Sequence, residues 1–387
     1  MYGSRSRNSA RSLFGSARAA RRRLAAAVMA LAVMAPMVPG VGTVRSAVAQ
    51  SQATAGSFEP LTFTGELNSD SPLLPSNGSF HQVHEFSGEA GQILVIEMVS
   101  EDFDTFLFLL DASGTPIAQN DDSEGTNSRI AVTLPGAGRY TVIANSFSAG
   151  EVGRYQLTIR EGSAQELERE EQLAEADRLN QQVIQLNQQG RYSEAIPLAQ
   201  QALAIRETAL GETHPNVATS LNNLAALYRA QGNYAAAEPL SQRSLSIWET
   251  ALGENHPDVA TSLNNLAELY RVQGNYAAAE PLYQRSLSIR ETALGEDHPD
   301  VATSLNNLAL LYQRQGNYGA AEPLYQRSLS IYETALGENH PDVATSLNNL
   351  AELYRVQGNY AAAEPLFQRS LSIDETALGE NHPSVAT

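Results

Sequence analysis

The sequence predicts two structural classes in one chain, an all-β sandwich followed by an all-α solenoid. Two observations carry this prediction. Residues 58–160 consist of short apolar runs with Gly, Pro, Asn and Asp between them. Further on, near-copies of one 42-residue segment begin at His214, His256, His298 and His340. A fixed period of this length, in copies too small to bury their own apolar faces, indicates a stacked repeat array.

The repeated segment is almost unchanged from copy to copy. The copies that begin at His256 and His340 differ at only three positions, Tyr283/Phe367, Arg290/Asp374 and Asp297/Asn381. A more divergent copy precedes them, so the sequence places a solenoid over residues 161–387. Its repeats are expected at about 172–213, 214–255, 256–297, 298–339 and 340–381, with a partial copy at 382–387.

Each copy is predicted to form two helices. In the copy that begins at His256, Pro257 suits the first helical position, where its missing N–H costs nothing. Gly274 and Asn275 end this first helix and cap the second, which is expected from about Tyr276 to Leu294. Within the first helix, apolar residues recur at three- and four-residue steps and form one stripe: Val259, Leu263, Leu266, Leu269 and Tyr270.

This pattern resembles the tetratricopeptide repeat, in the 42-residue form found in kinesin light chains. The resemblance covers roughly residues 165–387. It implies a right-handed superhelix whose first helices line a concave, peptide-binding groove, and it implies no particular partner. The matching residues are Leu266, Ala267, Tyr270, Gly274, Tyr276, Ala279, Tyr283 and Leu287, together with the strings LNNLA and ALGExHP.

Composition limits the classes of function. The chain has 43 acidic residues against 25 basic ones, all of them arginine. Such a surface repels nucleic acid and anionic lipid, so neither is an expected partner. Cysteine is absent, which excludes disulfides and cysteine nucleophiles. No P-loop, HExxH, GxSxG or dinucleotide-binding pattern occurs. We therefore interpret the chain as non-enzymatic, with no cofactor expected except the calcium considered below.

Residues 1–49 have the pattern of a secretory signal peptide. Arginine and serine are frequent in the first 23 residues, an apolar run of 15 residues follows at 24–38, and Ala47-Val48-Ala49 supplies small residues for cleavage. The alternative is a membrane anchor, but this run is too short to cross about 30 Å as a helix. We expect export to the periplasm or the extracellular space, no membrane span after cleavage, and a flexible linker at 50–57.

Residues 58–160 predict a β-sandwich. The strings DFDTFLFLLDASGTPIAQNDD, NSRIAVTLPGAGRYTVIA and GRYQLTIR are similar to the bacterial pre-peptidase C-terminal domain, which implies a secreted jelly-roll module. A helix is expected after the sandwich, where Ser163 and Glu166 have capping-box spacing. Eight strands are expected near 58–66, 79–86, 92–100, 104–111, 115–119, 129–134, 138–145 and 153–160.

Two sets of residues raise the question of metal binding. Calcium takes six to eight oxygen ligands. The densest carboxylate cluster predicts a calcium site at Asp102, Asp104, Asp121 and Asp122, and it also contains Asp111 and Glu124. The alternative is that Asp111 and Asp121/Asp122 only build turns. One histidine per repeat is spaced on the order of 10 Å from the next, too far to share a zinc ion. These histidines are interpreted as loop residues: His214, His256, His298, His340 and His382.

A pair of asparagines falls on the first helix of each repeat, where a packed apolar stripe has no use for amides. In tetratricopeptide repeats this part of the helix faces the groove. An amide both donates and accepts, so the pairs predict a grip on a peptide backbone. The alternative is that one asparagine of each pair hydrogen-bonds between neighbouring repeats. The pairs are Asn222/Asn223, Asn264/Asn265, Asn306/Asn307 and Asn348/Asn349.

Other positions expected to face the groove differ between copies. A constant amide grip beside variable neighbours suits a groove that reads sequence, and neutral drift after duplication gives the same pattern. The predicted binding cations are Arg229, Arg271, Arg314 and Arg355. The variable positions hold Ala226, Glu268, Leu310 and Glu352; Arg229, Arg271, Gln313 and Arg355; and Ala230, Val272, Arg314 and Val356.

The predicted function is that of an exported scaffold that binds an extended peptide or a partner protein. Two alternatives stay open. In the first alternative, the chain is the N-terminal part of a larger signalling or protease protein. In the second, the sandwich binds an extracellular polymer and the repeats are a spacer. The sequence stops six residues into its sixth copy, so we also expect self-association through an uncovered last repeat.

Overall fold

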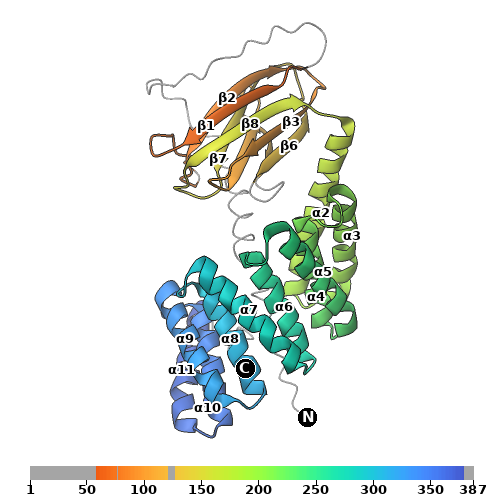
Figure 1. Ribbon diagram of the computed structural model, residues 1–387. Coiled ribbons are helices and arrows are strands. Elements are labelled where there is room, and N and C mark those ends of the chain that lie inside the picture. The colour runs from red at the N-terminus through yellow and green to blue at the C-terminus, as the bar shows by residue number, and fades with distance from the viewer. Residues whose placement is uncertain (1–57, 76, 121–126, 379–387) are drawn as a thin grey trace. The chain divides into compact units, whose positions relative to one another are not determined.

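The computed structural model describes residues 58–75, 77–120 and 127–378 (Figure 1). They form two compact units, one up to Glu175 and one from Ala176 onward. The predicted signal peptide, the linker at 50–57, Asp121, Asp122 and the partial sixth repeat lie outside the described residues. Within the described ranges, none of the helices combines the length and the apolar character needed to cross a membrane.

The first unit is a sandwich of two antiparallel four-stranded sheets (Figure 1). One sheet has the order β1-β8-β3-β6 and the other β2-β7-β4-β5, which is the order of a jelly roll. The predicted fold class is confirmed, and the strands lie close to their expected positions. They are β1 (Leu61–Leu67), β2 (His81–Gly88), β3 (Ile93–Val99), β4 (Thr105–Leu110), β5 (Pro116–Asn120), β6 (Ser128–Thr133), β7 (Gly138–Ser146) and β8 (Gly153–Glu161).

The sandwich core contains one polar network among its apolar side chains. Leu94 and Ile96 of β3 face Leu107 of β4, and all three side chains are fully buried. His84 of β2 lies in the same layer, with Nε2 2.7 Å from the hydroxyl of Tyr155. That hydroxyl donates to Gln82 at 2.7 Å. Among the described residues, the buried His84 Nδ1 has no hydrogen-bond partner. A proton there would be buried and unpaired, so this imidazole is held neutral.

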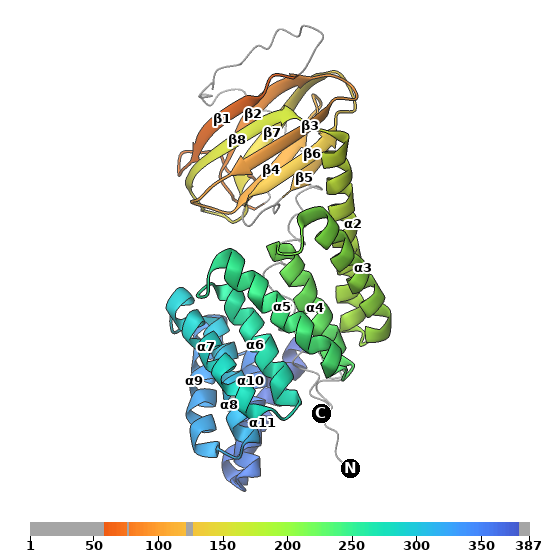
Figure 2. The same ribbon diagram turned by 45° about the vertical axis from the view of Figure 1, so that its right-hand side comes forward.

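The second unit is a stack of helical hairpins, and the predicted solenoid is confirmed. In both views the two helices of a repeat lie antiparallel and side by side (Figure 2). The helices are α2 (Ala164–Gln188), α3 (Tyr192–Leu210), α4 (Pro215–Ala230), α5 (Tyr234–Leu252), α6 (Pro257–Val272), α7 (Tyr276–Leu294), α8 (Pro299–Arg314), α9 (Tyr318–Leu336), α10 (Pro341–Val356) and α11 (Tyr360–Leu378).

Helix ends in the solenoid follow the residues that the period repeats. Asn275 Oδ1 accepts from the backbone N–H of Ala278, as expected for the cap of a second helix. Gly274 has φ +79°, a conformation that favours glycine at this helix end. The four described repeat histidines, His214, His256, His298 and His340, are more than loop residues, because each imidazole caps a first helix. His256 Nδ1, for example, accepts from the backbone N–H of Asp258 at 3.2 Å.

Successive repeats share their cores. Ile331 of α9 packs against Val301 of its own first helix and Val343 of the next one, and all three are buried. On the second helices, Arg285 reaches back to Glu249 of the preceding repeat at 2.6 Å, and this ion pair recurs with the period. At the last described helix, Leu371 exposes 43% of its surface. Self-association through that helix stays a prediction.

Residues 164–175, the first part of α2, belong to the first unit and are held to the sandwich by charged side chains. Ser163 Oγ accepts from the N–H of Glu166, and Glu166 accepts in return from the N–H of Ser163, which confirms the capping box. The hydrogen bond from Arg160, with its positive charge and the Ser163 bonds, lowers the pKa of Glu166 to about 2. Arg129 contacts Glu166 and Glu170 from β6 at 3.0 and 3.1 Å.

The buried imidazole makes the stability of the sandwich depend on pH. Burial lowers the pKa of His84 from 6.5 to about 4, so the unfolded chain binds its proton first as the pH falls. Stability from this residue is therefore complete above pH 6.5 and falls by about 3 kcal/mol towards pH 4. Urea unfolding of the sandwich between these pH values measures it. His84→Gln keeps a donor near Tyr155 and should flatten this slope; an unchanged slope would contradict the assignment.

Candidate functional site

The first helices α4, α6, α8 and α10 lie next to one another along the solenoid (Figure 2). Their asparagines form a ladder of side-chain bonds in which the second amide of one repeat donates to the first amide of the repeat before it. This is the inter-repeat bond that the sequence left open as the alternative. The bonds run from Asn265 to Asn222 at 3.0 Å, from Asn307 to Asn264 at 2.9 Å and from Asn349 to Asn306 at 3.0 Å.

The ladder extends to α2 at its N-terminal side and, within the described residues, reaches as far as α10. Asn223 donates to Asn180 of α2 at 3.4 Å, whereas Asn348 of α10 is exposed and makes no ladder bond among the described residues. In the middle, Asn264 and Asn265 are only 7% and 8% exposed. Each ladder bond uses one donor of one amide and one acceptor of the other. Contact of the remaining amide groups with a peptide stays a prediction.

Two of the predicted binding arginines meet at a buried carboxylate. Arg271 donates to both oxygens of Glu268 at 2.7 Å, and Arg229 of the preceding repeat lies 3.1 Å from the same carboxylate. The hydroxyl of Tyr283 donates to it as well, at 2.8 Å. We call these four residues the Glu268 cluster. It holds two cations against one anion, so it carries an excess positive charge within an acidic chain.

The charges in this cluster fix its protonation. Burial alone would raise the pKa of Glu268, but the hydrogen bonds and charge of Arg271, with Arg229 beside it, hold that pKa below its usual value. Burial raises the pKa of the Tyr283 hydroxyl, and the Glu268 charge raises it further. The carboxylate is therefore ionised and the phenol neutral over the ordinary range of pH.

The same positions in later repeats build no such cluster. Leu310 replaces the carboxylate in α8, where the Tyr325 hydroxyl donates instead to Gln313 at 2.8 Å. In α10, Glu352 pairs with Arg355 at 2.6 Å, but the side chain of Arg355 is 53% exposed. Arg314 is exposed at the end of α8. The structure thus brings Arg229 and Arg271 together and leaves Arg314 and Arg355 apart from them.

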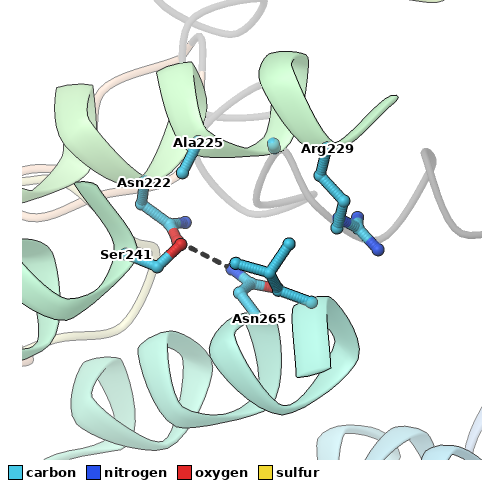
Figure 3. Close-up of a pocket in the computed structure, with 7 residues that line it drawn as sticks. Asn222, Ala225, Arg229, Ser241 and Asn265 are labelled. Atoms are coloured by element: carbon cyan, nitrogen blue, oxygen red, sulfur yellow. Dashed lines mark hydrogen bonds between the residues drawn. The ribbon is translucent and has the colours of Figure 1, made fainter. Parts of the chain in front are cut away.

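A small depression opens between α4 and α6 beside the Glu268 cluster (Figure 3). Ser241 of α5 stands where later repeats have Tyr283, Tyr325 and Phe367, and the small side chain leaves space on this face. The Arg229 side chain lies on one side of the depression, and the hydrogen bond between Asn265 and Asn222 lies at its base (Figure 3). The depression is lined by Asn222, Ala225, Ala226, Arg229, Ser241, Asn265 and Leu269.

Comparison with known proteins identifies the repeats. The family model of the tetratricopeptide repeat matches five overlapping stretches of the chain. Together they cover residues 174–387, more than half of the chain. The chain belongs to the tetratricopeptide repeat family. The family model of the bacterial pre-peptidase C-terminal domain matches residues 81–146 of the sandwich. No curated protein matches the chain.

Several solved structures are similar to this tetratricopeptide protein over about half of its length. Kinesin light chain repeats from Podosopora anserina are 26% identical, with a TM-score of 0.45 and coverage of 52% of this chain and 94% of that one. BtubC from P. vanneervenii is 23% identical, with a TM-score of 0.45 over 57% and 95%. Aspartyl phosphate phosphatase F from Bacillus subtilis is 16% identical, with a TM-score of 0.47 over 54% and 53%.

The predicted calcium ligands are only partly described. Asp102 accepts from the backbone N–H of Arg154 at 2.8 Å, and the backbone carbonyl of Asp104 accepts from Phe147. Asp111 builds a turn, as the alternative expected, by accepting from the N–H groups of Ser113 and Thr115. Within the described parts of this tetratricopeptide protein, no group of three metal-binding side chains occurs. Calcium binding through Asp121 and Asp122 stays a prediction.

The ladder predicts unequal costs for asparagines inside and outside it. Asn307→Ala removes the donor from the buried Oδ1 of Asn264 and should lower the free energy of unfolding of the repeats by about 1–3 kcal/mol. Asn348→Ala is the control, because Asn348 is exposed and makes no ladder bond within the described residues, and it should change stability by less than about 0.5 kcal/mol. Urea unfolding followed by helical circular dichroism measures both. Equal losses would show that the ladder bond adds no stability.

Proposed function

We propose that the chain is a scaffold that binds an extended segment of a protein partner along the face formed by α4, α6, α8 and α10. Tetratricopeptide repeats are protein-interaction modules, and this coarse role follows from the family. The finer proposal rests on the amides of this face. A row of side chains that both donate and accept suits a polypeptide backbone, whose groups alternate in the same way.

The depression at Arg229 supports an acidic segment at this point of the partner. The Glu268 cluster holds two guanidinium groups against one carboxylate, and its Arg229 lines the depression with Asn222 and Asn265. A carboxylate placed there would balance the excess charge in a partly desolvated site, where ion pairs are stronger than in water. The chain carries a formal charge of −18, so this local sign reversal favours one orientation of an acidic partner.

Filling the depression tests this proposal. Ala226 is half-buried at its rim, so Ala226→Trp should block it while the helix stays intact. Partner captured by the wild-type chain from the producing cells, and identified by mass spectrometry, should be lost with the variant. Ser288→Trp, on the exposed side of α7, is the control and should capture normally. Capture by both variants alike would exclude the depression from the binding surface. Replacing Asn264 and Asn306 would be a poorer test, because both accept ladder bonds.

We also propose that the scaffold works outside the cytoplasm, on the strength of the apolar run and Ala47-Val48-Ala49. The mature chain should then begin at or near Gln50. Mass spectrometry of the protein recovered from its own cells measures the N-terminus directly. An intact Met1 end in the cytoplasmic fraction would overturn the localisation without touching the binding proposal.

A further inference from the structure

Arg290 of α7 has a buried guanidinium whose hydrogen bonds, in the part of the chain that the structure describes, all go to neutral acceptors. It exposes 6% of its surface between α6 and α8. Its Nη1 donates to the carbonyl of Asp300 at 3.1 Å and to Ser304 Oγ at 2.9 Å, and its Nη2 donates to Thr261 Oγ1 at 3.2 Å. Among the residues that the structure describes, it forms no ion pair within 4.0 Å. An arginine taken out of water usually has a carboxylate beside it.

Charged groups face Arg290 only from a distance. Burial lowers the pKa of this guanidinium, and the acidic groups of Asp300, Tyr332 and Asp258 oppose that effect only in part. The side chains of Asp258 and Asp300 are 54% and 57% exposed at the starts of their helices. The positive charge is therefore buried and poorly compensated.

The repeat two periods earlier shows what is missing at Arg290. Arg206 occupies the same place on α3 and donates in the same way to a serine, Ser220 Oγ. Its Nη2, however, meets a carboxylate, Asp177 Oδ1, at 2.6 Å. Asp177 lies two repeat periods before Thr261. The two buried arginines thus differ in one partner, an aspartate in one case and a threonine in the other.

The position of Asp177 is open to solvent. Its side chain is 45% exposed although Arg206 is only 9% exposed, so a carboxylate at this place touches water on one side and a buried guanidinium on the other. Thr261 is likewise half-buried. An anion can therefore approach Arg290 from the solvent side of Thr261. In the next repeat the charge itself is gone, because Tyr332 occupies the arginine position and its hydroxyl lies 2.7 Å from Thr303 Oγ1.

We propose that Arg290 and Thr261 form an oxyanion subsite at the contact between α6 and α8, and that a carboxylate occupies it. The ligand oxygen takes the place of the Asp177 carboxylate, accepts from Arg290 Nη2 and neutralises the buried charge. The Thr261 hydroxyl, which donates to the Pro257 carbonyl at 3.4 Å, turns to the ligand instead. This subsite is separate from the depression at Arg229. The carboxylate belongs either to a small free anion or to an acidic side chain of a polypeptide.

Aspartates introduced by mutation give the first test. Thr261→Asp in the full chain should copy the Arg206–Asp177 pair and raise the Tm of the helical signal by about 3 °C. Thr303→Asp is the matched control, since it puts the same carboxylate at the same helix position beside Tyr332, and it should not raise Tm. A gain in both variants would assign the effect to the helix end, and a gain in neither would show that Arg290 needs no anion.

Added anions give the second test. Sodium acetate at about ten times its Kd, against sodium chloride at equal ionic strength, should raise the Tm of the wild-type chain by about 3–6 °C. Thr261→Asp and Arg290→Tyr, which copies the next repeat, should both lose this acetate-specific rise. A rise of equal size in all three proteins, or no rise in the wild type, would overturn the subsite.

Poly-aspartate distinguishes the two sources of the carboxylate. If the ligand is an acidic side chain of a polypeptide, poly-aspartate should give the same Arg290-dependent rise at a carboxylate concentration at least tenfold below that of acetate, because neighbouring contacts add to the affinity. Equal potency per carboxylate would assign the subsite to a free small anion. An effect of poly-aspartate that persists in Arg290→Tyr would place its binding elsewhere.

Discussion

The solenoid depends on burial that is shared between neighbours. A single helical hairpin of this chain leaves one apolar side uncovered, and that side becomes a core only when the next first helix packs on it. Ile331 illustrates this, because it is buried by residues from its own repeat and from the following one. Each such side chain contributes about 1.5–3 kcal/mol when fully buried. Every polar arrangement on the array, the asparagine ladder included, is held in place by this stacking.

The fold could be predicted from the sequence because its signals are local and periodic. The strands appeared as short runs between turn residues, and the helices α6 and α7 begin and end at the residues that their caps and glycines indicated. The asparagines could be placed on the first helices but not assigned a partner. Their bonds join residues 43 positions apart, and no pattern within one helix shows which neighbour an amide meets.

Identical helices in different surroundings show most clearly what the sequence of one repeat cannot predict. The sequences of α6 and α10 are the same, yet Glu268 lies in a buried cluster while the Glu352–Arg355 pair is largely exposed. The difference comes from Arg229 and Tyr283 around the first, where Gln313 and Phe367 stand around the second. The chemistry of a site in this array is set by the repeats on either side, and a single repeat read alone cannot reveal it. The hydrogen bond of His84 could not be predicted from the sequence for a similar reason, because its partner Tyr155 lies on the opposite sheet.

The asparagine ladder gives the first-helix face a polarity. Every bond points the same way, from the second amide of one repeat to the first amide of the repeat before it. The amide groups left over therefore recur in one fixed order along the face, an N–H donor on the first asparagine and a carbonyl acceptor on the second. A polypeptide backbone also has a direction. Running it from α4 to α10 or from α10 to α4 would present its donors and acceptors to this order in two inequivalent ways, so such a face distinguishes the two ends of whatever chain lies along it.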